Sequence, residues 1–138
     1  MKYLKTSILP AILLGFIGTL LYYSITNKNY GLETIKTDQV AGIIVDNTKD
    51  NGKVIQKSFV NSEDDIKQIT KDLNNIVKDQ RSFTEAEEPK DGVSTTITVS
   101  YKGDKEKVFN FKNKLIKIEN KYYGFKTKVQ ETKLYQIQ

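Results

Sequence analysis

Residues 62–80, SEDDIKQITKDLNNIVKDQ, carry the pattern that decides the fold class. Ser62 and the three acids after it are typical of a helix start, because serine can cap the first turn and carboxylates complement the helix dipole. The spacing of the apolar residues that follow predicts an amphipathic helix with one core-facing stripe. That stripe consists of Ile66, Ile69, Leu73, Ile76 and Val77. The opposite, solvent-facing side is expected to hold Lys67, Lys71, Asp72, Asn75, Lys78 and Asp79.

Strand patterns lie on both sides of this helix. Before it, the β-branched run at 40–46 (VAGIIVD) and the run at 53–60 are joined by Asn51-Gly52, a strong hairpin signal. After it, apolar and polar side chains alternate from Val93 to Tyr101, as in a half-buried strand. Tight turns then separate a strand that carries Phe109 and Phe111, a strand with Leu115, Ile116 and Ile118, and a strand at 122–125.

Strands joined by tight turns pair antiparallel, and one amphipathic helix can cover one face of the resulting sheet. We therefore expect an α+β two-layer domain over residues 39–138, with an antiparallel sheet of about five to six strands packed on one helix. Residues 82–92 are predicted to form a loop, and Phe109 and Phe111 to point into the core. Thr127 and Gln130 have capping-box spacing, so a short C-terminal helix or an edge strand closes the domain. Its apolar residues would be Val129, Leu134, Tyr135 and Ile137.

A run without charge, from Thr6 to Asn27, precedes the domain. As a helix it reaches roughly 33 Å, enough to cross a hydrocarbon core of about 30 Å. Lys2 and Lys5 favour a cytoplasmic N-terminus, which places the domain outside. We predict a signal anchor at 1–27 that contacts the membrane through residues 6–27, and a linker at 28–38. A cleaved signal peptide, which would make the protein secreted, is the competing interpretation.

The composition removes several kinds of chemistry. The chain has no Cys and no His, which excludes disulfides, thiolate nucleophiles, His-dependent triads and the usual zinc ligands. No cofactor, metal or catalytic residue is therefore predicted. Four carboxylates crowd one predicted loop, at Glu85, Glu87, Glu88 and Asp91, which leaves a small enzyme using carboxylate or Lys chemistry as an alternative.

Charge is distributed unevenly along the chain. Residues 62–91 are acidic, whereas residues 102–133 are basic and carry aromatic residues between their lysines. With the domain outside the cell, such a patch suits an anionic envelope polymer or an envelope protein, and no nucleic acid partner is expected. The candidate anion or envelope contacts are Lys105, Lys107, Lys112, Lys114, Lys117 and Lys121.

The arrangement of residues 38–138 resembles a family of small uncharacterised domains. The helix, the following loop with Ser82 and Pro89, the strand pair and the motif Lys121-Tyr122-Tyr123 before the closing 131–137 element carry this resemblance. Such domains occur on secreted or membrane-anchored proteins of low-GC Gram-positive bacteria. The resemblance implies an extracytoplasmic setting and assigns no catalytic residue.

Three functional hypotheses follow from these features. The leading one is a single-pass, membrane-anchored and non-catalytic binding or regulatory module that acts outside the cytoplasmic membrane. The second is the small envelope enzyme that the carboxylate loop leaves open. The third is an immunity or exclusion protein of a mobile element that acts through the span itself.

Overall fold

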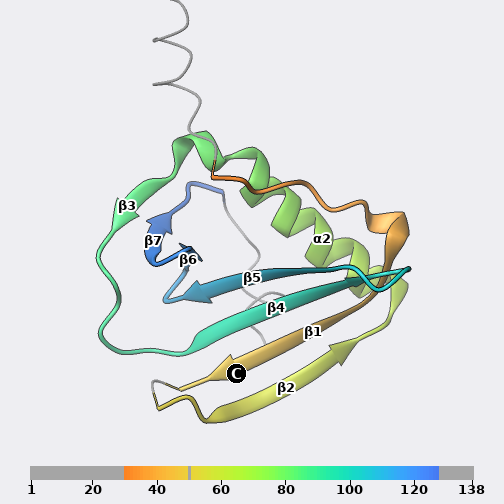
Figure 1. The fold of residues 1–138 in the computed structure, drawn as a ribbon, viewed down its shortest axis with the longest axis horizontal. Helices are drawn as coiled ribbons and strands as arrows, with labels where there is room; N and C mark the ends of the chain where they lie inside the picture. The colour runs from red at the N-terminus through yellow and green to blue at the C-terminus, as the bar shows by residue number, and fades with distance from the viewer. Residues whose placement is uncertain (1–29, 50, 128–138) are drawn as a thin grey trace, which may run out of the picture.

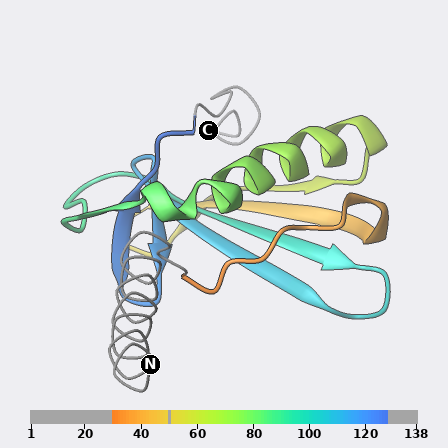
Figure 2. The same cartoon turned by 90° about the horizontal axis from the view of Figure 1, so that it is seen from above.

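One helix lies against one face of an antiparallel sheet in the computed structural model, which describes residues 30–49 and 51–127 (Figures 1 and 2). Within these residues the sheet has seven strands in the order β2-β1-β4-β5-β6-β7-β3. The α+β prediction is thereby confirmed. The strands are β1 (Val40–Thr48), β2 (Val54–Val60), β3 (Thr84–Ala86), β4 (Ser94–Tyr101), β5 (Glu106–Lys112), β6 (Leu115–Ile118) and β7 (Lys121–Gly124). The helices are α2 (Glu63–Lys78) and two 3-10 turns, η1 (Thr37–Gln39) and η2 (Gln80–Ser82).

The expected number of five to six strands is wrong because β3 lies inside the predicted loop at 82–92. β3 has three residues and pairs antiparallel with β7, so that Glu85 lies opposite Tyr123. A strand this short has no alternating apolar pattern of its own. It exists because residues nearly forty positions later supply its hydrogen-bonding partner, which local sequence cannot reveal.

Helix α2 presents the predicted apolar stripe to the sheet. Its five stripe residues are all buried, from Ile66 to Val77. Ser62 takes the N-cap position in an extended conformation, and its carbonyl accepts the Ile66 N–H at 2.9 Å, but its side chain makes no capping hydrogen bond. The prediction that Asp72 faces solvent is wrong, because this residue is 6% exposed and accepts a hydrogen bond from Gln68 Nε2 at 3.1 Å.

The sheet face under α2 is apolar because every second residue of the central strands points toward the helix. Ile97 and Val99 of β4 are fully buried there. Phe109 and Phe111 of β5 are buried beside them, which confirms their predicted inward orientation. The core is therefore a layer between one helix and the middle of the sheet.

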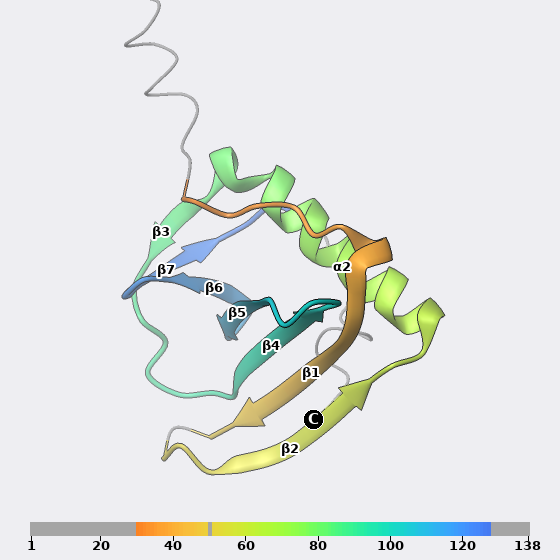
Figure 3. The same cartoon turned by 45° about the vertical axis from the view of Figure 1, so that its right-hand side comes forward.

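Residues 30–39 run along α2 and cover an edge of this core (Figures 1 and 3). The Asn74 side chain accepts the Ile35 N–H at 2.6 Å and donates to the Ile35 carbonyl at 2.9 Å. Ile35 is buried. Tyr30 packs against the rings of Phe83 and Tyr123, with centroids 5.5 and 4.7 Å apart. Residues 30–38, although interpreted as linker, therefore contribute to the folded domain.

Within residues 30–49 and 51–127, no helix combines the length and the apolar character needed to cross a membrane. The predicted span at 6–27 lies outside the described residues. So do Val129, Leu134, Tyr135 and Ile137 of the predicted closing element.

Candidate functional site

The sheet face opposite α2, called here the outer face, carries a polar row that crosses six strands. Strand register places each member beside the next, because paired residues of an antiparallel sheet point to the same side. The row runs Lys57, Asp46, Thr96, Asn110, Lys117 and Tyr122, from β2 to β7. Hydroxyl, amide, carboxylate and ammonium groups thus follow one line over the outer face.

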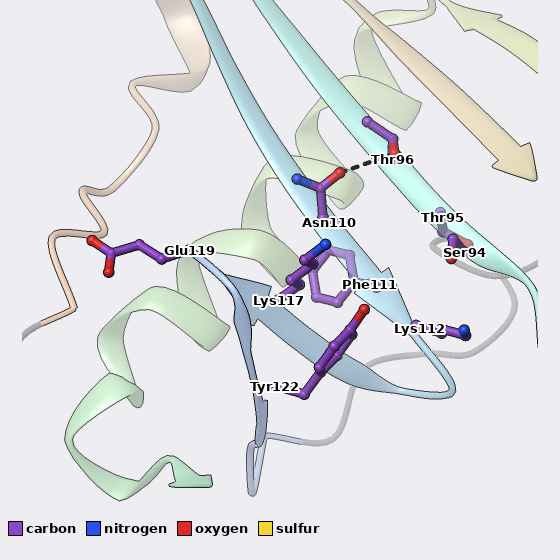
Figure 4. A pocket seen from close by; sticks show the side chains of 9 residues that line it. All are labelled: Ser94, Thr95, Thr96, Asn110, Phe111, Lys112, Lys117, Glu119 and Tyr122. Atoms are coloured by element: carbon purple, nitrogen blue, oxygen red, sulfur yellow. Dashed lines mark hydrogen bonds between the residues drawn. The ribbon is translucent and has the colours of Figure 1, made fainter. Parts of the chain in front are cut away.

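A pocket of about 280 Å³ opens on this face, over β4, β5, β6 and β7 (Figure 4). Its volume lies just below the range of about 300–1,000 Å³ that is usual for small-molecule sites. It therefore has room for one small unit of a ligand. The lining residues are Ser94, Thr95, Thr96, Asn110, Phe111, Lys112, Lys117, Glu119 and Tyr122.

Hydrogen bonding fixes the polar wall of the pocket. Thr96 Oγ1 donates to Asn110 Oδ1 at 3.0 Å, as the dashed line in Figure 4 shows. Because the Asn110 oxygen accepts this bond, its Nδ2 group is oriented as a donor beside Lys117. The strand register fixes the order of these residues, since Asn110 lies opposite Thr96 of β4 on one side and opposite Lys117 of β6 on the other.

Tyr122 forms the aromatic side of the pocket. The residue is 6% exposed, and its hydroxyl donates to Glu88 Oε1 at 3.4 Å. Lys117 Nζ lies 5.8 Å from the centroid of the Tyr122 ring, within the range of a cation–π contact. The ring therefore positions the ammonium group at the mouth of the pocket.

The pocket has a positive balance. Lys112 and Lys117 both line it, and they come from neighbouring strands. Glu119 is the one carboxylate among the nine lining residues, and Figure 4 shows it directed away from the others. The arrangement can accept a negatively charged group together with hydroxyl groups, through ammonium, amide and hydroxyl donors.

Of the six predicted contact lysines, the structure brings Lys112 and Lys117 together in the pocket. Lys105 lies in the β4–β5 turn and Lys114 in the β5–β6 turn, where its φ is 62°. The six side chains therefore do not form one patch.

The other two predicted lysines are held by neighbours outside the pocket. Lys107 lies opposite Val99 and donates to the carbonyls of Glu33 and Thr34 at 3.4 and 3.3 Å. Lys121 forms an ion pair with Glu85 at 3.7 Å. Both contribute positive charge to other parts of the surface.

The acidic loop does not converge on a reaction centre in the structure. Glu85 pairs with Lys121, and Glu88 accepts the Tyr122 hydroxyl. Glu87 and Asp91 are exposed. Within the part of the chain that the structure describes, no group of three or more acidic side chains is arranged to hold a metal ion.

Sequence reasoning did not single out Ser94, Thr96 and Asn110 as site residues. Each is a polar residue at an outer-face position of an alternating strand, which is also the pattern of any solvated sheet face. The only signal that distinguishes them is their register against Lys112 and Lys117, which depends on tertiary pairing.

Comparison of the chain with models of protein families, with curated proteins and with solved structures finds no match. The family resemblance suggested by Lys121-Tyr122-Tyr123 therefore stays a prediction.

Proposed function

We propose that this protein is a membrane-anchored, non-catalytic binding module that acts outside the cytoplasmic membrane and holds an anionic, hydroxyl-bearing polymer of the cell envelope. The observation that carries the proposal is the outer-face pocket, where Lys112 and Lys117 lie beside Thr96, Asn110 and the Tyr122 ring.

The chemistry of the pocket supports this class of ligand. Ammonium groups bind phosphate or carboxylate through charge-assisted hydrogen bonds. The Ser94 and Thr96 hydroxyls and the Asn110 amide suit the hydroxyl groups of sugars and polyols, which both donate and accept. The Tyr122 ring closes the same place on its apolar side and lies under the Lys117 ammonium group.

The polar row supports a polymer as the ligand. Beyond Asn110 the row continues through Thr96 and Asp46 to Lys57. Neighbouring strands lie about 4.8 Å apart, so the row from Lys57 to Tyr122 is roughly 24 Å long. A ligand chain can lie across the strands with one unit in the pocket and other units along the row.

A non-catalytic role is supported by the groups that the pocket gathers. Acid–base catalysis needs two positioned groups that exchange protons near neutral pH. The lining contributes hydroxyls, an amide, ammonium groups and one carboxylate that points away. These groups suit binding better than proton transfer.

The place of action rests on the predicted anchor. A span at 6–27 with Lys2 and Lys5 on its N-terminal side would put residues 30–138 outside the membrane. Protease treatment of intact cells should then remove the domain. Protection of the domain in intact cells, with cleavage only after the membrane is opened, would contradict the proposed location.

Binding can be tested by sedimentation of the full-length protein, in detergent micelles, with cell-wall fragments of a Gram-positive bacterium. The fragments are used either intact or after acid extraction of their anionic polymers. We expect the protein to sediment with intact fragments and to stay in solution with extracted ones. Addition of salt should release it, because charge pairing at an exposed site is screened.

The matched variants are Lys112→Ala/Lys117→Ala, which removes both positive charges of the pocket, and Lys71→Ala, which removes an exposed positive charge from α2. The pocket variant should lose binding, whereas the helix variant should bind as the native protein does. Equal binding to intact and extracted fragments, or equal binding by all variants, would overturn the proposed ligand class.

A further inference from the structure

Strand β2 is an edge strand with an unusually apolar exposed surface. Among the described residues, four large apolar side chains are strongly exposed, and β2 holds three of them. These are Val54 at 53%, Ile55 at 44% and Phe59 at 71%. β2 pairs with β1 on one side only, over Val54–Val60.

An edge of this kind is prone to pair with another strand. The backbone N–H and C=O groups on its open side have no strand partner among the described residues, and the apolar side chains gain from being covered. The opposite edge of the sheet differs, because β3 has three residues and therefore offers a short edge. The long open edge is thus specific to β2.

The charges at the two ends of β2 indicate which strand would pair there. Lys49 and Lys53 lie before the strand, while Glu63, Asp64 and Asp65 follow it. When two identical strands pair antiparallel about a twofold axis, the start of each lies beside the end of the other. A second copy of β2 would therefore bring its basic end to the acidic end of the first, at both ends of the interface.

We propose that the chain forms a homodimer in which β2 pairs antiparallel with β2 of a second copy, with Ser58 on the twofold axis. This register brings the basic start of β2, at Lys53, to the end of β2 in the second copy, where α2 begins at Glu63. It also places Lys57 beside Phe59 of the second copy, instead of beside its own equivalent. Lys57 Nζ already lies 5.7 Å from the Phe59 ring within one chain, so the two side chains suit each other.

The charge of Lys57 disfavours one of the two neighbouring registers. A twofold axis at Lys57 would set two like charges directly opposite each other, which is destabilising. Glu63 forms an ion pair with Lys67 at 3.2 Å, but both side chains are well exposed. Such a surface pair contributes little, so Glu63 can also meet Lys53 of the second copy.

The dimer has a consequence for binding. An axis perpendicular to the sheet keeps both outer faces on the same side, so two pockets would face one surface. If the pocket binds a polymer, as proposed above, two linked sites raise the overall affinity without new contacts. The dimer itself stands on the β2 surface and does not depend on the ligand.

Cysteine pairing can test the register, because the chain has no cysteine of its own. We would introduce Ser58→Cys into the full-length protein, place it in detergent micelles, and add an oxidant that accepts the two electrons of disulfide formation. Directly opposite residues in an antiparallel pair have Cα atoms about 4.5–5.5 Å apart, inside the range for a disulfide. We expect a covalent dimer.

Gln56→Cys is the matched control. In the proposed register Gln56 lies beside Val60 of the second copy, and its own equivalent is four residues away, roughly 14 Å along the strand. A disulfide cannot span that distance without backbone movement. We expect Ser58→Cys to cross-link at least about tenfold faster than Gln56→Cys. This ratio corresponds to a free-energy difference of at least about 1.4 kcal/mol between the two variants in bringing their sulfur atoms together.

A charge test uses the Ser58→Cys background. Lys53→Glu should slow cross-linking about threefold by turning two end contacts into repulsions. Lys102→Glu, which changes the same charge in the β4–β5 turn, should leave the rate unchanged. A folded Ser58→Cys protein that stays monomeric under the oxidant would overturn the dimer. Equal cross-linking of Ser58→Cys and Gln56→Cys would overturn it too, because random collision would then explain both.

Discussion

At the residue scale, Lys117 depends on two neighbours for its place in the pocket. Asn110 lies beside it on β5, and the Tyr122 ring lies beside it on β7. The aromatic face favours the ammonium group without neutralising it, so the charge stays available to a ligand. Lys117→Ala should therefore weaken binding of an anionic wall polymer about tenfold, the loss of one charge-assisted contact. Titration of full-length protein with the extracted polymer measures this loss.

Gly92 determines how closely the loop before β4 approaches the β5–β6 turn. Its φ is 134°, and a Cβ there would overlap the side-chain amide of Asn113. Asn113 Nδ2 donates to the Asp91 carbonyl at 2.6 Å and so ties the loop to the turn. We expect Gly92→Ala to destabilise the fold by about 2–3 kcal/mol, from strain and loss of this contact.

Gly52→Ala is the control for this prediction. Gly52 also has positive φ, at 77°, but a Cβ there would meet open space. Gly52→Ala should lower the free energy of unfolding by about 1 kcal/mol, because alanine is strained at positive φ. Urea unfolding of both variants gives the comparison, and equal losses would show that the Asn113 contact is unimportant.

Asp79 is expected to make the stability of the domain depend on pH. Hydrogen bonding from Ser82, reinforced by Thr127, holds the pKa of the Asp79 carboxyl below its usual value in spite of partial desolvation. Thr127 Oγ1 lies 3.1 Å from Asp79 Oδ2. Because the folded pKa is lowered, the stabilisation is full above the unfolded pKa of about 4 and is lost as pH falls through the folded pKa.

The test compares the native protein with Asp79→Asn by urea unfolding across a range of pH. The native protein should be the more stable at about pH 7, and the difference should shrink as pH falls below about 4. A difference that stays the same from neutral pH down to about pH 2.5 would show that the charge of Asp79 has no part in it.

At the scale of elements, α2 stabilises the domain through a polar contact as well as through its apolar stripe. Asn74 satisfies both backbone groups of Ile35 and so attaches residues 30–39 to the helix. Asn74→Ala would leave the Ile35 N–H and carbonyl without this partner. We expect the free energy of unfolding to fall by about 2–3 kcal/mol. Hydrogen exchange at the Ile35 amide should speed up accordingly.

Asn75→Ala is the neighbouring control, because the Asn75 side chain is exposed. The free energy of unfolding of the Asn75→Ala variant should differ from that of the native protein by less than about 0.5 kcal/mol. If both variants lost the same stability, the effect would come from the helix itself and not from the attachment of residues 30–39.

The elements with strong local patterns could be predicted from sequence. The stripe from Ile66 to Val77 located α2 to within two residues at each end, and the alternation after Val93 located β4. Asp72 shows the limit of such patterns, because periodicity placed it on the solvent side although it is buried. β3 was missed because three residues hold too little pattern and depend on β7.

At the scale of the whole molecule, the order of the strands could not be predicted. β1 lies beside β4, and β3 lies at the far edge beside β7, so pairings between distant segments complete the sheet. The pairings of β4, β5 and β6 bring Thr96, Asn110 and Lys117 into one row. The sequence indicated basic strands with aromatic residues, but the selection of Lys112 and Lys117 from six lysines required the fold.

The two faces of the sheet differ in burial and polarity. One face packs with α2 and buries the apolar side chains, which leaves the outer face of the same strands open for polar groups. The proposed binding at that face would therefore need no rearrangement of the core. Removal of the pocket charges should accordingly abolish binding while leaving the unfolding midpoint nearly unchanged, within the range of ordinary surface substitutions.

The proposed function depends on binding of an anionic envelope polymer at the outer-face pocket. The most direct test is the affinity of the full-length protein for an isolated, soluble wall polyanion, measured at increasing salt for the native chain, Lys112→Ala/Lys117→Ala and Lys71→Ala. We predict tight, salt-sensitive binding that the pocket variant loses and the Lys71→Ala variant keeps. Binding that is equal in all three proteins, or that salt does not weaken, would contradict the proposed function.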